Sequence, residues 1–138
     1  MKKGLETDIF PRFSETDAGG YISNTSYFIY MEEARSKFFQ AIGFAGAENR
    51  RNIDFIIASA ACDFIAQASA GQTLKITTMV DKIGTKSFAL THRVNDKETG
   101  SLIAAGQAAI VCFDFQKQRS EPIPIALRGL LEGILVPA

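Results

Sequence analysis

The chain has no tryptophan, only one histidine and only two cysteines among its 138 residues. The lone His92 and the widely separated Cys62 and Cys112 do not form a zinc-ligand pattern, so neither a metal nor another cofactor is expected. Both cysteines lie in apolar, strand-like runs, and free cysteine is among the residue types most often buried. We therefore expect two reduced thiols in the core.

Net charge is also lacking, because 15 basic residues balance 15 acidic ones. This balance argues against a nucleic acid or an anionic membrane surface as the partner. The first ten residues contain two lysines but no apolar core of signal-peptide length, and no stretch is long and apolar enough for a membrane span. A cytoplasmic enzyme or binding protein is expected, built as the single domain 1–138.

One long helical pattern covers residues 27–42 and ends at Gly43. Its apolar residues recur at spacings of three and four, as in an amphipathic helix: Tyr27, Tyr30, Met31, Ala34, Phe38, Ala41 and Ile42. The side predicted to face away from the core holds Glu32, Glu33, Arg35, Ser36 and Lys37. Residues 23–26 offer several side-chain oxygens that can cap the first turn.

Glu15 and Asp17 stand just before this helix start. A carboxylate beside a helix N-terminus can act as a base or nucleophile on a carbonyl group whose oxygen is polarised by the helix amides, which suits acyl transfer. Acidic residues at this place are also common as ordinary turn and capping residues. Taken alone, the pattern favours the turn interpretation.

A family resemblance changes this balance. Residues 15–20 (ETDAGG), then Asn24, then residues 27–35 (YFIYMEEAR) closely resemble the signature of the 4-hydroxybenzoyl-CoA thioesterase-like family of hot-dog-fold acyl-CoA thioesterases. The motif covers the first third of the chain, and the remainder is similar in length and strand pattern. Two positions differ: Glu15 stands where Asp is frequent, and Tyr21 stands where many members carry His.

By this resemblance the family's catalytic aspartate falls on Asp17. It would hydrolyse the thioester of an acyl-CoA, either as the nucleophile or as a general base on water, and the sequence leaves both routes open. Backbone amides at the helix start, at Asn24, Thr25 and Ser26, would hold the oxyanion. Asn24 is equally well interpreted as the helix N-cap.

The resemblance further implies a homodimer or homotetramer, with Asp17 at a subunit interface. Lys82, Lys86 and Ser87 resemble the family's basic residue and serine at the start of the third strand, where they would bind CoA; exposed turn lysines are the alternative interpretation. Glu32 and Glu33 are a lesser hypothesis, because a second group of hot-dog thioesterases uses a helix glutamate.

The rest of the chain has the pattern of strands. Residues 6–14 predict a short strand interrupted by Pro11, and residues 44–52, which include Arg50 and Arg51, predict a loop. Antiparallel strands are predicted over four further runs: 54–68, 72–83, 87–95 and 102–115. In the second and third of these runs, every second residue lies on one face of its strand. These residues are Leu74, Ile76, Thr78 and Val80 in the second run, and Phe88, Leu90, His92 and Val94 in the third.

The run 102–115 is apolar on both faces and rich in small residues, which leaves room for the long helix to pack closely. The residues therefore predict an α+β protein. The resemblance makes it a hot-dog fold, an antiparallel twisted sheet wrapped around one long central helix. Because one helix cannot cover such a sheet, we expect self-association. The tail, with Pro122 and Pro124, predicts one or two helical turns.

Other functions stay compatible with this sequence. A non-catalytic protein that binds acyl thioesters could share the fold, since fold alone does not determine activity. The carrier could be an acyl carrier protein instead of CoA. Hydratase chemistry is disfavoured, because it needs an Asp/His pair and His92 lies far from Asp17 in a strand.

Overall fold

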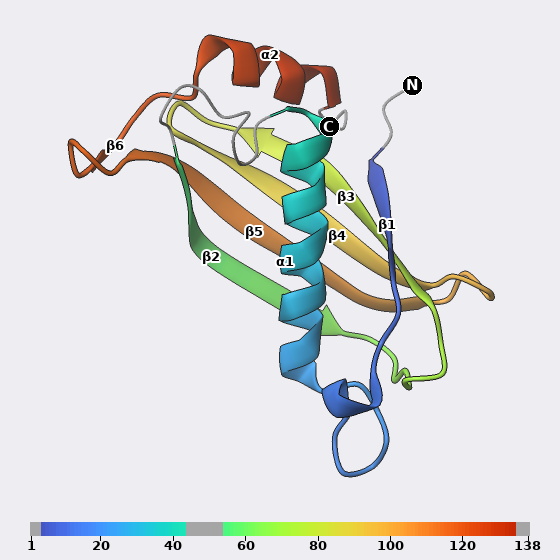
Figure 1. Ribbon diagram of the computed structural model, residues 1–138. Coiled ribbons are helices and arrows are strands. Elements are labelled where there is room, and N and C mark those ends of the chain that lie inside the picture. Colours follow the sequence, from blue (N-terminus) through green and yellow to red (C-terminus); the bar gives the residue numbers. More distant parts are fainter. Residues whose placement is uncertain (1–3, 44–53, 135–138) are drawn as a thin grey trace.

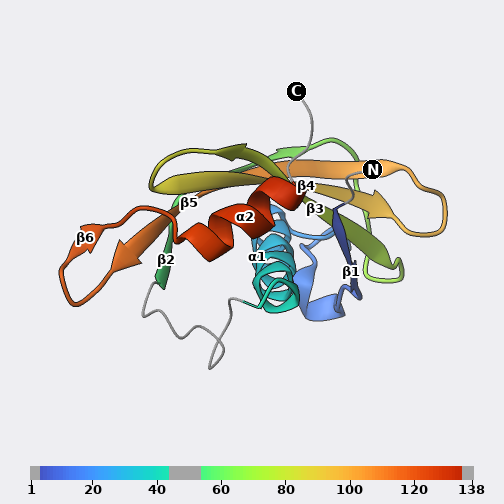
Figure 2. The ribbon, with the colours of Figure 1, turned by 90° about the horizontal axis from the view of Figure 1, so that it is seen from above.

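A single antiparallel sheet carries two helices on the same face (Figures 1 and 2). The computed structural model describes residues 4–43 and 54–134, so the predicted loop with Arg50 and Arg51 lies outside the described residues. The elements follow the chain in this order: β1 (Leu5–Ile9), the 3-10 turn η1 (Phe13–Glu15), α1 (Asn24–Ala41), β2 (Asp54–Phe64), β3 (Leu74–Ile83), β4 (Ser87–Asp96), β5 (Leu102–Asp114), β6 (Arg119–Ser120) and α2 (Ile125–Ile134).

The sheet has the strand order β1-β3-β4-β5-β2, with β6 paired to the end of β5. The predicted alternation on β3 and β4 is confirmed, because the residues predicted to share one face are buried: Leu74, Ile76, Thr78 and Val80 of β3, and Phe88, Leu90, His92 and Val94 of β4. The first predicted strand is shorter than expected and ends at Ile9, after which Pro11 is buried and η1 begins. Strand β2 ends at Phe64 instead of residue 68, since the amides of Ile65 and Ala66 both turn to the carbonyl of Ile103.

Helix α1 crosses the concave side of the sheet, as predicted (Figure 2). It packs tightly against β5 at Gly106, where a Cβ atom would collide with the Met31 side chain and lie 3.0 Å from the carbonyl oxygen of Ala61. The small residues of β5 therefore make room for the helix. The loop between η1 and α1, which contains Asp17, lies at the lower end of the molecule (Figure 1).

The expectation that Arg35 faces solvent was wrong. Its side chain is only 7% exposed, and its guanidinium Nη1 lies 3.4 Å from His92 Nε2. His92 Nδ1 lies in turn 2.9 Å from the hydroxyl of Thr78. His92 is fully buried, so its interpretation as a packed sheet residue is confirmed. The polar group Arg35, His92 and Thr78 lies between two separate apolar clusters of the core.

The C-terminal helix α2 is longer than the one or two helical turns predicted for the tail, while α1 remains the one long central helix. Helix α2 spans Ile125–Ile134, and its Leu127 and Leu131 are buried against Val80 and Leu90 of the sheet. It covers the part of β3 and β4 that α1 leaves open (Figure 2). The apolar surface from which we expected self-association is therefore largely covered within one chain.

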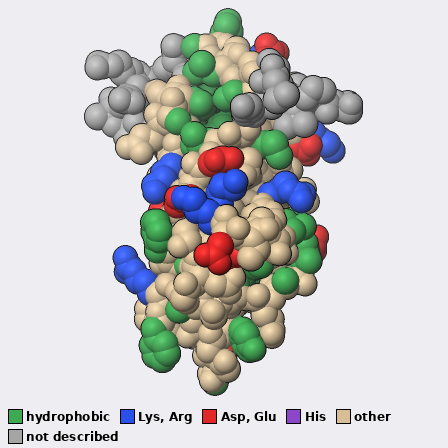
Figure 3. Space-filling model, turned by 90° about the vertical axis from the view of Figure 1, so that its right-hand side faces the viewer, with side chains coloured by type: hydrophobic (Ala, Val, Ile, Leu, Met, Phe, Trp, Pro, Cys, Tyr) green, Lys and Arg blue, Asp and Glu red, His purple; other side chains and the backbone are tan. Residues whose placement is uncertain are grey.

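The two outer strands of the sheet differ in length and charge. Strand β1 is short and carries ion pairs, Glu6 with Lys75 at 3.6 Å and Asp8 with Lys97 at 2.5 Å. Charged side chains of both signs gather across the middle of the side on which β1 lies (Figure 3). Strand β2 has eleven residues, mostly exposed, and its only charged residues are two aspartates.

The cysteines are both free thiols, as expected. Cys112 lies in the core, where burial raises its pKa to about 11. Cys62 differs from the expectation, because it lies on the exposed strand β2 and is only half-buried. Among the described residues no helix is long and apolar enough to cross a membrane.

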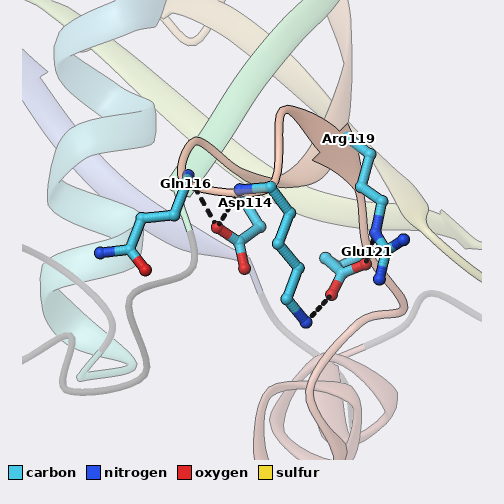
Figure 4. A network of polar contacts seen from close by, with 5 residues as sticks. Asp114, Gln116, Arg119 and Glu121 are labelled. Carbon is cyan, nitrogen blue, oxygen red and sulfur yellow. Dashed lines mark hydrogen bonds and ion pairs between the residues drawn. The ribbon is translucent and has the colours of Figure 1, made fainter.

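A polar turn joins β5 to β6 at the far end of the sheet (Figure 4). Asp114 Oδ1 accepts hydrogen bonds from the amides of Gln116 and Lys117, at 2.9 and 3.2 Å. Glu121 accepts a hydrogen bond from Arg119 Nε at 3.2 Å and pairs with Lys117 at 3.6 Å.

Candidate active site

The Asp17 loop is a tight reversal of the chain between η1 and α1. An antiparallel β-bridge between Thr16 and Ile22 closes it. Two backbone hydrogen bonds add to this closure: the Asp17 amide donates to the Tyr21 carbonyl at 2.7 Å, and the Gly20 amide donates to the Asp17 carbonyl at 3.0 Å. Gly20 has a φ angle of 85°, which favours glycine. The glycine of the sequence motif is thus needed to form the turn that presents Asp17.

The carboxylate of Asp17 is exposed but held in one orientation. Its Oδ1 accepts hydrogen bonds from the amides of Gly19 at 2.9 Å and Tyr21 at 3.1 Å. Within residues 4–43 and 54–134 the other oxygen, Oδ2, has no hydrogen-bond partner. One oxygen is therefore anchored by the loop while the second is available for chemistry.

A cleft of about 390 Å³ opens beside this carboxylate. Loop, helix start and the segment after β2 contribute its lining: Asp17, Tyr21, Ile22, Asn24, Tyr27, Phe64, Ile65, Ala66 and Gln67. The Ile22 amide donates to the Ala68 carbonyl at 2.8 Å, which fixes the loop to that segment. The centre of the Phe64 ring lies 5.7 Å from that of Tyr27, so the two rings form an aromatic wall of the cleft that Asp17 also lines.

The start of α1 contributes Asn24 to the cleft, but Asn24 is not the N-cap. The helix begins at Asn24, three residues earlier than predicted, and Ser23 is the N-cap residue. The Ser26 amide donates to the Ser23 carbonyl at 3.0 Å and is therefore occupied. The amides of Asn24 and Thr25 have no partner among the described residues, so they remain as donors at the positive end of the helix dipole.

Glu15 has a structural role that the sequence did not predict. Its Oε1 accepts hydrogen bonds from the Arg12 amide and from the Tyr30 hydroxyl, both at 2.8 Å. Its backbone carbonyl accepts from the Ser23 amide at 3.0 Å and from the hydroxyls of Ser23 and Ser26 at 2.9 Å. Glu15 thereby joins η1 to the first two turns of α1.

The tyrosines next to the cleft are buried and remain protonated. Burial, with a smaller effect of Cys62, raises the pKa of Tyr27 to about 12. Burial and the hydrogen bond to Glu15 raise the pKa of Tyr30 even further. The pKa of Glu15 is lowered, chiefly by the Arg12 amide and also by the Tyr30 hydroxyl.

Lys82, Lys86 and Ser87 lie at the β3–β4 turn. This turn and the loop between η1 and α1 stand at opposite ends of the molecule (Figure 1). Both lysines are exposed, and the Ser87 carbonyl accepts the Gly84 amide at 2.7 Å. One chain therefore does not bring these three residues to Asp17. Glu32 and Glu33 are also exposed on the outer side of α1, away from the cleft lining.

Among the residues that the structure describes, no group of three or more His, Cys, Asp or Glu side chains could hold a metal ion. The cleft instead combines an oriented carboxylate, helix N-terminal amides and an aromatic wall on a sheet wrapped around a helix. These features define an α+β protein of the hot-dog class.

Comparison with known proteins identifies the family. Residues 11–131 match the model of the thioesterase-like superfamily. The acyl-CoA thioesterase YbgC of Helicobacter pylori is 35% identical over 127 residues, which are 89% of this chain and 93% of that protein. The chain therefore belongs to the thioesterase-like superfamily, a group of thioester hydrolases.

Solved structures agree with this assignment. A predicted thioesterase from Bacillus stearothermophilus has a TM-score of 0.84 and 28% identity, over 97% of this chain and 98% of that one. The BH1999 gentisyl-coenzyme A thioesterase has a TM-score of 0.79 and 28% identity, over 93% of this chain and 99% of that one. The hot-dog topology expected from the motif is thus confirmed.

Proposed function

We propose that this protein hydrolyses the thioester bond of an acyl-CoA, with Asp17 as the nucleophile or the general base. The observation that carries the proposal is the shared cleft of Asp17 and Asn24 at the start of α1. The acyl-CoA thioesterase activity named for the Helicobacter pylori relative supports the reaction type. No cofactor enters the reaction.

The reaction uses the available oxygen of Asp17. Oδ2 either attacks the thioester carbonyl carbon, expelling the CoA thiolate and leaving an anhydride that water cleaves, or accepts a proton from the water that attacks. In both routes the C–S bond breaks and the products are a free acid and the CoA thiol. The free amides of Asn24 and Thr25 stabilise the negative charge on the former carbonyl oxygen.

The complete site belongs to a dimer in this proposal. Strand β2 is an outer strand, long and nearly free of charge, whereas β1 carries the ion pairs that discourage pairing. Two copies of β2 that pair antiparallel place the Phe64 end of one strand beside the Asp54 end of the other. This joins the cleft of one chain to the opposite end of its partner's sheet.

The same pairing explains the position of the basic turn. Asp54 pairs with Phe113 of β5, and Val111 of β5 pairs with Ser87 of β4. Lys86 and Ser87 therefore lie at the Asp54 end of the sheet. In the dimer they approach the partner's cleft, where Lys82, Lys86 and Ser87 bind the phosphates of CoA.

The test is thiol release from a panel of acyl-CoAs of graded chain length, with benzoyl-CoA and phenylacetyl-CoA added. We expect turnover by the wild type and a loss of about 10²–10⁴-fold for Asp17→Asn. Asp114→Asn is the matched control, because the Asp114 carboxylate also accepts two backbone amides in a turn but does not line the Asp17 cleft of its own chain.

Equal turnover by wild type and Asp17→Asn would refute the assigned role of Asp17. Absence of turnover on every acyl-CoA would refute the proposed substrate and favour an acyl carrier protein as the carrier, or binding without catalysis. Loss of turnover in Asp114→Asn equal to that in Asp17→Asn would attribute the effect to loosened turns instead of chemistry.

A further inference from the structure

We infer that the hydrogen bond between Glu15 and Tyr30 positions the Asp17 loop for hydrolysis, holding the reacting carboxylate and the free helix amides in one relative geometry. This inference rests on the proposed function of Asp17. Glu15 is a positioning residue and not a catalytic one, because it does not line the cleft and its Oε1 already accepts two hydrogen bonds.

The bonds around Asp17 show why such a link is needed. The Asp17 carboxylate accepts its hydrogen bonds from the amides of Gly19 and Tyr21, which belong to the same loop. They give the loop its shape but do not fix it to α1. The connection to the helix runs through Glu15, two residues before Asp17, whose carbonyl and carboxylate contact the first and second turns of α1.

Tyr30 provides a fixed point on the helix. Its side chain is 3% exposed and belongs to the apolar cluster that includes Met31 and Ile76. Its ring lies edge-on to Tyr27, with 5.9 Å between the ring centres, and Tyr27 lines the cleft. The hydroxyl of Tyr30 is thus placed by packing, so the Glu15 carboxylate that accepts its hydrogen bond is placed as well.

The hydrogen bond from Tyr30 to Glu15 is stronger than one between two neutral groups. An ionised acceptor makes a shorter and stronger hydrogen bond than a neutral one, and loss of the Glu15 side chain removes the carboxylate that accepts this bond from the buried Tyr30 hydroxyl. Because a misplacement of about 1 Å can cost about 100-fold in rate, a loosened loop should affect turnover before it affects folding.

The experiment compares kcat and KM for Tyr30→Phe, Glu15→Ala and Glu15→Gln on the acyl-CoA that the wild type hydrolyses best. We expect kcat to fall about 10- to 100-fold in Tyr30→Phe and Glu15→Ala with KM nearly unchanged. Glu15→Gln keeps an oxygen that can accept both hydrogen bonds, so it should recover most of the lost turnover.

The double variant Glu15→Ala with Tyr30→Phe tests whether the two residues act as one unit. We expect its kcat to be no lower than that of the worse single variant, since each change breaks the same bond.

Two controls separate this effect from folding. Glu121→Ala removes a carboxylate with ion pairs at the β5–β6 end, and Leu127→Ala opens a cavity under α2.

All variants are compared at a temperature where circular dichroism shows them folded. Leu127→Ala should lower the melting temperature yet keep the wild-type kcat, whereas Tyr30→Phe should lower kcat with a smaller loss of melting temperature. Should Tyr30→Phe fail to fold, the comparison of Glu15→Gln with Glu15→Ala decides. Wild-type kcat in Tyr30→Phe or in Glu15→Ala, or additive losses in the double variant, would overturn the inference while the role of Asp17 stands. Full activity of Asp17→Asn would instead overturn the proposed function.

Discussion

Gly106 shows how one residue sets the distance between helix and sheet. It lies opposite His92 on β4 and Cys62 on β2, in the row of the sheet that Met31 covers. A side chain at this position would meet both the Met31 side chain and the Ala61 carbonyl. The absence of a Cβ atom therefore allows α1 to pack as closely as it does.

Gly106→Ala should lower the free energy of unfolding by about 1–3 kcal/mol, because it overpacks a buried contact. Urea unfolding followed by circular dichroism measures this change. Gly71→Ala is the control, since a Cβ atom there meets nothing within 4 Å. The effect of Gly106→Ala should also be smaller in a Met31→Ala background, where the collision is relieved. Equal stability of Gly106→Ala and wild type would contradict this account.

At the scale of elements, α1 is joined to β3 and β4 by the buried group of Arg35, His92 and Thr78. Burial and the nearby Arg35 guanidinium lower the pKa of His92 to about 3, so the imidazole is neutral. Its Nε2 then accepts from Arg35, and its protonated Nδ1 donates to the Thr78 hydroxyl. Arg35 is charged without a carboxylate in hydrogen-bond contact among the described residues.

This arrangement predicts that acid weakens the fold well above the pH at which carboxylates titrate. An unfolded histidine binds its proton near pH 6.5, but His92 in the folded protein does not until about pH 3. The stability that depends on a neutral His92 is therefore fully present above pH 6.5. It falls as the pH drops below 6.5, by up to about 1.4 kcal/mol per pH unit. Urea unfolding at pH 7 and pH 5 measures the slope.

The control for this slope is His92→Asn, whose amide can donate and accept but does not titrate. We expect it to be less stable than the wild type at pH 7 and to lose less stability on going to pH 5. Glu15 and Asp96 stay ionised over this interval, since their pKa values are lowered. A wild-type stability that is constant between pH 7 and pH 5 would show that His92 does not control this dependence.

The elements also show what sequence reasoning can reach. The alternation of β3 and β4 was readable because each buried face is set by neighbours two residues apart. The burial of Arg35 was not, because its partner His92 lies 57 residues away. The helix start was misjudged at residues 24–26, whose side chains are typical of caps; Ser26 is buried because it bonds Glu15. The two prolines near residue 123 obscured the extent of α2.

The candidate site divides in the same way. Asp17 and Asn24 were identified through the spacing of a motif, and the chain brings both into one cleft. The bond from Glu15 to Tyr30 was not foreseen, because an acidic residue before a helix fits many roles. Lys86 lies far from this cleft in one chain, and only the proposed dimer would bring it there, so its position could not be predicted from the sequence of one chain.

For the whole molecule, the proposed dimer can be tested at the middle of β2. Ser59 lies at the centre of Asp54–Phe64 and is exposed. In an antiparallel pair of β2 strands, Ser59→Lys brings two like charges close together, which weakens pairing. We expect sedimentation velocity to show a dimer for the wild type and a larger monomer fraction for Ser59→Lys.

Thioesterase activity should fall together with dimerisation, because each cleft then loses the partner's basic turn. Ser36→Lys is the matched control, since it adds the same charge on the exposed side of α1. A monomeric wild type that is fully active would contradict the dimer. So would an unchanged sedimentation coefficient for Ser59→Lys.

The buried guanidinium of Arg35 has a last consequence for the whole molecule. If α1 slid along the sheet by one turn, about 5.4 Å, Arg35 would leave His92 and enter one of the apolar clusters on either side. Met31 would at the same time lose its place over Gly106. The helix thus has one permitted register. This register also fixes the position of the amides in the first turn of α1, about 16 Å from Arg35 along the helix axis.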